Sequence, residues 1–72
     1  MKQPKFKLFQ SDKDDQWYFS LIAPNGETIA QSEGYISKQN ALKGINSVKE
    51  NATTAKVFEI TEITVDYNFE KD

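Results

Sequence analysis

Acidic side chains are the first residues to consider for chemistry, because the chain contains neither histidine nor cysteine. Without these two residues, the common structural zinc sites, thiolate nucleophiles and histidine general bases are excluded. Asp12, Asp14 and Asp15 could offer oxygen ligands to calcium, but a helix–loop–helix calcium loop requires glycine at its sixth position and glutamate at its twelfth. Trp17 and Ala23 stand there instead. The three aspartates are therefore interpreted as a solvated turn, and no metal or cofactor site is predicted.

Paired carboxylates offer a second route to catalysis, in which one group acts as acid and the other as base. Glu27, Glu33 and Glu50 are scattered along the chain, and the sequence shows no partner or apolar surroundings for any of them. Nothing sets one of them apart as a proton donor or acceptor. We predict no catalytic residue and expect a protein that is not an enzyme.

Trp17, Tyr18 and Phe19 could form a stacking platform for single-stranded nucleic acid. Three lysines could neutralise the phosphate backbone beside it: Lys2, Lys5 and Lys7. All nine basic residues of the chain are lysines, and the absence of arginine counts against a dedicated nucleic-acid reader. The favoured interpretation is that Trp17 and Phe19 belong to the core and Tyr18 packs beneath a neighbouring strand. A weak single-strand binder using the aromatic sheet face remains the alternative.

Gly34 and Tyr35 lie just before an expected helix and form a second candidate contact. An aromatic side chain there could orient a ligand on the free amides of the first helical turn. More often such a tyrosine covers the core. Tyr18, Gly34 and Tyr35 are kept as possible ligand or partner contacts.

Three strands are expected to position these residues. Alternation of Phe6 and Leu8 with lysines indicates a first strand of about six residues. The range 16–23 is the strongest strand signal, with Trp17, Phe19 and Leu21 on one face and Tyr18, Ser20 and Ile22 on the other. A turn at 24–26 then leads into a third strand at 27–32.

A helix of about fourteen residues is expected after Ser37, a good N-cap. Its apolar stripe should dock on the sheet and consists of Ala41, Ile45, Val48 and Ala52. Gly44 lies beside that stripe although glycine costs about 1 kcal/mol in a helix interior. This predicts a close approach of the helix to a strand or to another subunit.

The C-terminal part alternates like a strand in two segments. Residues 55–60 place Phe58 and Ile60 on one face, and the opposite parity then follows at Ile63, Val65, Tyr67 and Phe69. The change of phase indicates a bulge or bend. A strand of about fourteen residues would be long for so small a domain, since roughly 3–10 is usual. An arm that reaches a neighbouring chain would explain this length.

Size and charge point the same way. A 72-residue chain without disulfide or metal builds a marginal core, so association with another chain is expected. The net charge is −2, the first residues lack the apolar region of a signal peptide, and no window reaches a transmembrane length. We expect a cytoplasmic protein with no membrane contact, built as one domain over 1–72 with a strand-like extension at 61–72.

Several motifs, in this order and spacing, resemble the YegP-like domain of unknown function. They are Trp17-Tyr18-Phe19, Pro24-Asn25-Gly26-Glu27, Ser32-Glu33-Gly34-Tyr35, Ser37-Lys38 and the segment 44–52. The resemblance covers about residues 6–60. Departures are the absence of a glycine at 13–15 and a tail that runs past the usual end after Glu62.

The resemblance implies an α+β fold, a βββαβ unit that forms a shared sheet in a homodimer by exchange of C-terminal strands. This chain would be a single-repeat member whose segment 57–60 pairs with the partner's sheet. No catalytic or ligand residue is carried over from the family. The chain is therefore interpreted as a small non-enzymatic homodimeric interaction or accessory module. Its predicted dimer interface comprises Val57, Phe58, Ile60, Ile63, Val65, Tyr67, Phe69 and Gly44.

Overall fold

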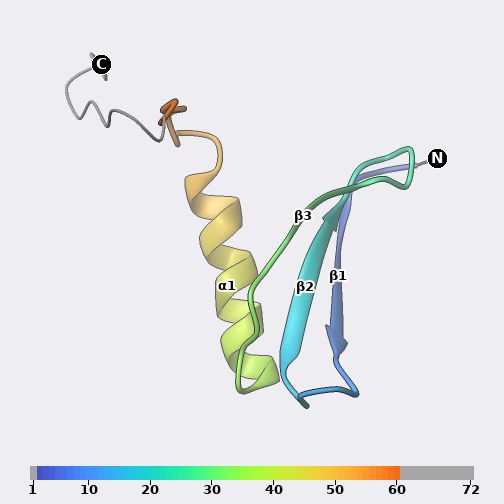
Figure 1. The fold of residues 1–72 in the computed structure, drawn as a ribbon. Helices are drawn as coiled ribbons and strands as arrows, with labels where there is room; N and C mark the ends of the chain where they lie inside the picture. Colours follow the sequence, from blue (N-terminus) through green and yellow to red (C-terminus); the bar gives the residue numbers. More distant parts are fainter. Residues whose placement is uncertain (1, 61–72) are drawn as a thin grey trace.

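The computed structural model describes residues 2–60 and contains three strands followed by one helix (Figure 1). The elements are β1 (Lys5–Gln10), β2 (Trp17–Ile22), β3 (Thr28–Gln31) and α1 (Lys38–Asn51). The three expected strands and the expected helix are confirmed, and the fold is α+β with the order βββα. The predicted extension at 61–72 lies outside the described residues, as do four predicted interface residues: Ile63, Val65, Tyr67 and Phe69.

The strands form an antiparallel sheet in the order β1-β2-β3, so β2 is central as expected. The turn between β1 and β2 closes with Asp15 in the left-handed region at φ 63°, where its amide donates to the carbonyl of Ser11 at 3.0 Å. Aspartate tolerates this conformation better than most side chains do. Asp15 therefore takes the positive-φ position of this turn, because residues 13–15 contain no glycine.

The turn between β2 and β3 uses the residues expected of it. Gly26 adopts φ 93°, and its amide donates to the carbonyl of Ala23 at 2.9 Å. The amide of Glu27 donates to the Asn25 side-chain oxygen at 3.1 Å, an Asx turn. The register shifts where β3 pairs with Leu21 and Ile22, which marks a bulge beside this turn.

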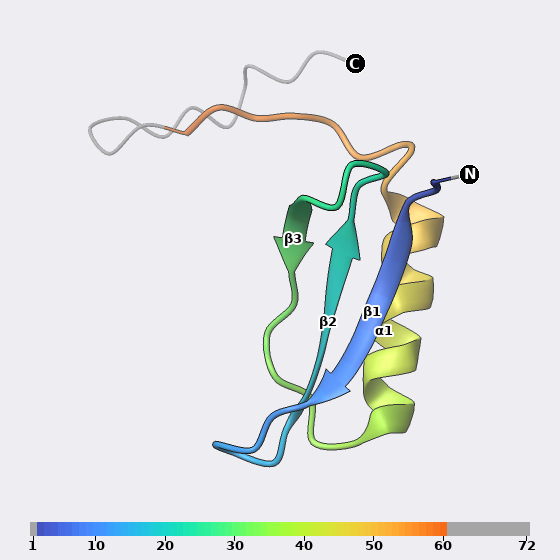
Figure 2. The same cartoon turned by 90° about the vertical axis from the view of Figure 1, so that its right-hand side faces the viewer.

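Helix α1 covers one face of the sheet (Figure 2) and begins where the sequence predicts. The Ser37 hydroxyl accepts a hydrogen bond from the amide of Asn40 at 3.0 Å and caps the first turn. Within residues 2–60, the buried apolar side chains are Phe19, Ala41 and Ile45. A core this small stabilises the domain only marginally.

Tyr35 joins the loop before α1 to the sheet and to the helix. Its amide and carbonyl exchange hydrogen bonds with those of Trp17, at 2.8 and 2.7 Å, and its ring stacks on Phe19 with centroids 6.0 Å apart. A β-carbon at Gly44 would lie 2.8 Å from the Tyr35 Cζ, would overlap its hydroxyl, and would lie 3.1 Å from the Phe19 ring. The close approach predicted at Gly44 is therefore made to a tyrosine of the same chain, and a contact of Gly44 with a partner stays a prediction.

The strand expected at 55–60 is not formed within this chain. These residues have no regular secondary structure and are exposed, Val57 to 90%. The helix ends at Asn51 and directs the following residues away from the three strands (Figure 1). A strand needs a neighbour to pair with its amides and carbonyls, and within residues 2–60 the sheet pairs only β1, β2 and β3.

We expect Gly44→Ala to destabilise the domain although alanine is the better helix former. The gain in helix propensity is about 1 kcal/mol, whereas forcing a methyl group into a packed contact costs about 1–3 kcal/mol. The net loss should appear as a lower urea midpoint at fixed protein concentration. In the Gly44→Ala background, Tyr35→Phe should recover part of it by removing the overlapping hydroxyl.

Lys43→Ala is the matched control, because Lys43 directly precedes Gly44 in the helix and its side chain is exposed. Its effect should stay within about 0.5 kcal/mol, as for ordinary surface substitutions. A Gly44→Ala protein as stable as the parent would contradict the packing described for Tyr35.

Candidate functional site

An apolar groove lies on the helix side of the sheet, between α1 and β3. Its volume is about 270 Å³. Phe6, Phe19, Leu21 and Ala30 contribute from the sheet, and Val48 from the helix. The remaining lining residues come from β3 and the loop that follows it: Gln31, Ser32, Glu33 and Tyr35. This composition suits apolar side chains better than a charged ligand.

The groove exists because the helix covers only part of the sheet. Within the described residues, α1 packs against β2 and β1, and no contact joins it to β3. All four residues of β3 are exposed, including Ile29 at 60%. The outer edge of β3 also has no neighbouring strand in the three-stranded sheet. An uncovered face and an unpaired edge therefore meet along the same strand.

Apolar side chains of a different segment remain exposed in the same chain. Val57, Phe58 and Ile60 are exposed to 90%, 46% and 68%. They lie after α1, which ends at Asn51, and within the segment predicted to pair with a partner. The chain thus contains both an exposed segment with apolar side chains and an apolar groove, and this segment does not line the groove.

The three consecutive aromatic residues do not form one platform. Phe19 faces the helix and is 7% exposed, whereas Tyr18 lies on the opposite face and stacks on Phe9 with centroids 5.8 Å apart. Successive side chains of a strand point to opposite faces, so adjacent aromatics cannot share one surface. Phe9, across the strand pair from Tyr18, is an aromatic partner that the sequence did not reveal. The sequence indicated that Phe9 shares a face with Lys5 and Lys7, but it did not show the pairing register.

Tyr18 is held by a hydrogen bond from its hydroxyl to the Asp14 carboxylate at 2.6 Å. The other carboxylate oxygen accepts from the amide of Gln16 at 2.9 Å. The Tyr18 bond, and then the Gln16 bond, lower the pKa of Asp14 below its usual value. The same bond raises the pKa of Tyr18, because the charged carboxylate favours the protonated phenol. Both carboxylate oxygens of Asp14 are thus used inside the turn.

Gly34 and Tyr35 occupy structural positions. A β-carbon at Gly34 would overlap the side chain of Gln16 and would lie 3.1 Å from the Tyr18 hydroxyl. Tyr35 packs on Phe19 and lines the apolar groove. The structure therefore brings Gly34 close to Tyr18 but places Tyr35 on the helix side of the sheet. A ligand contact for these three residues stays a prediction.

Within residues 2–60, no group of three acidic, histidine or cysteine side chains is placed to hold a metal ion. No helix in that part of the chain is long and apolar enough to cross a membrane. Lys38 lies over the Trp17 ring, with its amine 6.0 Å from the centroid. Within residues 2–60, the arrangement offers an apolar groove beside a strand edge that pairs with no further strand.

These features define a small α+β domain with a three-stranded antiparallel sheet, one helix and an apolar groove beside β3. The chain belongs to the family described as "Domain of unknown function (DUF1508)", whose sequence model matches residues 12–59. It is 46% identical to a UPF0339 protein of Treponema denticola, over 78% of this chain and 95% of the relative. It is 52% identical to a UPF0339 protein of Photorhabdus laumondii, over 69% of this chain and 44% of the relative.

A solved structure supports the fold. The NMR solution structure of a protein from Haloferax volcanii superposes with a TM-score of 0.72 at 42% sequence identity, covering 82% of this chain and 98% of that chain. An uncharacterised small-domain family, as expected from the sequence, is therefore confirmed. The names of these relatives state no activity, substrate or partner. The chain spans nearly all of one relative and less than half of another.

We expect Asp14→Asn to lower the pKa of Tyr18 toward its ordinary value, because the amide lacks the charge that holds the phenol protonated. Ultraviolet absorbance of tyrosinate during alkaline titration measures this, and Tyr18→Phe identifies the component that belongs to Tyr18. In the parent protein, the stabilisation from the raised Tyr18 pKa is present below pH 10 and is lost as the pH rises through the folded-state value.

The stabilisation from Asp14 has the opposite dependence. It is present above the ordinary aspartate pKa of 3.8 and is lost as the pH falls through the lower folded-state value. Asp12→Asn is the control, since Asp12 lies in the same turn. An equal shift of the Tyr18 titration in both variants would show a general charge effect and contradict the hydrogen bond.

Proposed function

We propose that this protein is a non-enzymatic interaction module that acts as a YegP-like single-repeat homodimer with exchanged C-terminal strands. The observation that carries the proposal is the pairing of an unfilled apolar groove with an exposed apolar segment in one chain. In a dimer, each chain's segment at 57–60 would meet the groove of the other chain. The shared sheet would then have the βββαβ order expected from the resemblance.

The exchanged segment would add a strand along the open edge of β3. In an extended strand, Phe58 and Ile60 share one face, while Val57 and Glu59 share the other. With the first pair directed into the groove, Glu59 stays in water. Full burial of each large apolar side chain stabilises by about 1.5–3 kcal/mol, and the unpaired amides and carbonyls of β3 gain partners.

The lengths of the relatives support a single unit that pairs with a second one. The Treponema denticola relative is nearly fully covered by this chain, whereas the match covers 44% of the Photorhabdus laumondii relative. The longer protein has room for two such units in one chain. Two copies of the short chain would supply the same pair of units by association.

The absence of histidine and cysteine from the chain supports a role without catalysis. Asp14 already binds Tyr18 and the turn amide, so it serves the fold. The nucleic-acid alternative has weaker support, because Tyr18 and Phe19 lie on opposite faces and a carboxylate sits beside the Tyr18 hydroxyl. An accessory or interaction role in which the dimer presents its surface to another molecule remains the proposed function.

Sedimentation equilibrium at micromolar concentration should give twice the chain mass of 8.3 kDa. The double variant Phe58→Asp/Ile60→Asp should shift the mass toward that of a single chain, because two carboxylates cannot enter an apolar groove without a large desolvation cost. Glu59→Gln, on the opposite face of the same segment, should stay dimeric. A parent protein that sediments as a clean monomer, or a double variant that remains a dimer, would contradict the proposal.

Strand exchange has a separate test, because the chain has no cysteine of its own. Ala30 lines the groove from β3. Chains carrying Ala30→Cys, mixed under oxidising conditions with chains carrying Phe58→Cys or Ile60→Cys, should form a disulfide between the two different chains in at least one pairing. Directly paired strand positions meet the distance that a disulfide requires.

Glu59→Cys is the matched control for cross-linking, since its side chain should face away from the groove. It should form markedly less of the mixed dimer with Ala30→Cys. The segment does not lie along β3 of the partner if Glu59→Cys cross-links to Ala30→Cys as well as Phe58→Cys and Ile60→Cys do. The same conclusion follows if neither Phe58→Cys nor Ile60→Cys cross-links to Ala30→Cys. A dimer without exchange would then remain.

A further inference from the structure

A second hollow lies at the opposite face of the sheet, beside the turn between β2 and β3. Its volume is about 670 Å³, and it opens to solvent. The N-terminal residues, β1 and the turn together line it: Lys2, Gln3, Lys5, Lys7, Ile22, Ala23, Pro24, Asn25, Gly26 and Thr28. We call it the lysine hollow. It is separate from the apolar groove, with which it shares no lining residue.

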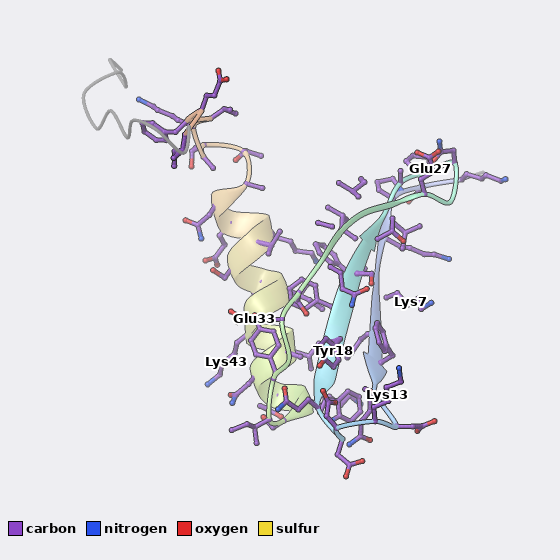
Figure 3. All side chains as sticks on the ribbon, in the orientation of Figure 1. Lys7, Lys13, Tyr18, Glu27, Glu33 and Lys43 are labelled. Carbon is purple, nitrogen blue, oxygen red and sulfur yellow. The ribbon has the colours of Figure 1, made fainter. Side chains whose placement is uncertain are left out.

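Positive charge is concentrated in the lysine hollow. Lys2, Lys5 and Lys7 are three of the nine lysines in a chain of net charge −2, and no acidic side chain lines the hollow. Lys5 and Lys7 are two residues apart on β1, so strand alternation places both on the same face. Figure 3 shows Lys7 directed away from α1, toward solvent. Glu27 stands between the lining residues Gly26 and Thr28 in the sequence but does not itself line the hollow.

Hydrogen-bond donors accompany the lysines. Thr28 offers a hydroxyl, and Asn25 offers an amide nitrogen with two donors while its oxygen accepts from the amide of Glu27. The apolar side chains of Ile22, Ala23 and Pro24 complete the lining. Lys2, Lys5 and Lys7 line the hollow beside these donors, and the Lys7 Nζ lies 5.7 Å from the centroid of the Phe9 ring. Their positive charge matches an anion that carries several charges on oxygen.

We propose that the lysine hollow binds a compact anion with two or more phosphate charges, such as a pyrophosphate group. Lysine is a point-charge binder of phosphate and does not need the planar geometry that arginine offers. The hollow is large enough for such a group and for part of a molecule that bears it. This site is independent of the proposed strand exchange, which uses the other face of the sheet.

The charge distribution favours a compact anion over a strand of nucleic acid. The far end of the β1–β2 pair leads into the turn with Asp12, Asp14 and Asp15, and Asp14 binds Tyr18 on the lysine face. Lys5 and Gln10, at the two ends of β1, are about 17 Å apart in an extended strand, more than the Debye length of about 8 Å at physiological salt. A polyanion that follows the strands would leave the lysines and meet these carboxylates.

Titration of the full ¹⁵N-labelled chain with sodium pyrophosphate tests the proposal. At 50 mM salt, amide shifts should move in a saturable way and cluster at Lys5, Lys7, Asn25, Gly26 and Thr28. The double variant Lys5→Gln/Lys7→Gln should weaken binding by about tenfold or more, since each removed charge is close to the anion. Both lysines are exposed, so their replacement should leave the fold intact. Unchanged amide shifts away from the hollow will confirm that the variant is folded.

Lys43→Gln/Lys49→Gln changes the net charge equally from positions on α1 outside the hollow. It should keep the affinity within about twofold, because neither lysine lines the hollow and salt screens the more distant charges. An equal loss in both double variants, or shifts that do not cluster at the hollow, would overturn the site. Tighter binding of a ten-residue oligothymidylate than of pyrophosphate, with shifts extending over Phe9 and Tyr18, would overturn it in favour of nucleic acid.

Discussion

The contact of Tyr35 with β2 and α1 is the interaction on which the rest of the structure depends. Its backbone extends the sheet by pairing with Trp17, and its ring lies between Phe19 and the surface of the helix at Gly44. The loop before α1 is short, so this one residue sets where the helix starts and how closely it approaches the sheet. Residues 2–60 contain no disulfide and no side-chain group placed to hold a metal ion that could fix the helix in its place.

The placement of the helix explains why the two candidate surfaces differ. Because α1 packs over β2 and β1, the face of β3 on the helix side remains open and apolar. In residues 2–60 no helix covers the opposite face, which carries the lysines of β1. One side of the sheet therefore suits another protein strand, and the other suits an anion. The exposed segment at 57–60 matches the first of these surfaces in chemical character.

Predictions from local sequence were correct wherever local physical chemistry dominates. Ser37 caps the helix because its hydroxyl reaches an amide of the first turn, and Gly26 takes the positive φ that the turn requires. Predictions that needed a partner across the sheet were less complete. Strand alternation places Phe19 and Tyr18 on opposite faces, as the favoured interpretation expected, but the stacking of Tyr18 on Phe9 depends on register and was not predicted.

The sequence by itself determined the three strands, the helix that follows them and its N-cap, because these follow from side-chain type and period. The further strand expected at 55–60 was not formed within this chain, because a strand also needs a neighbour to pair with. The sequence also indicated that Gly44 faces a close neighbour. Only the tertiary structure decided that this neighbour is Tyr35, that β3 stays uncovered, and that Lys2, Lys5 and Lys7 gather around one turn. Those features depend on strand register and on the position of the helix over the sheet, which join residues far apart in the chain.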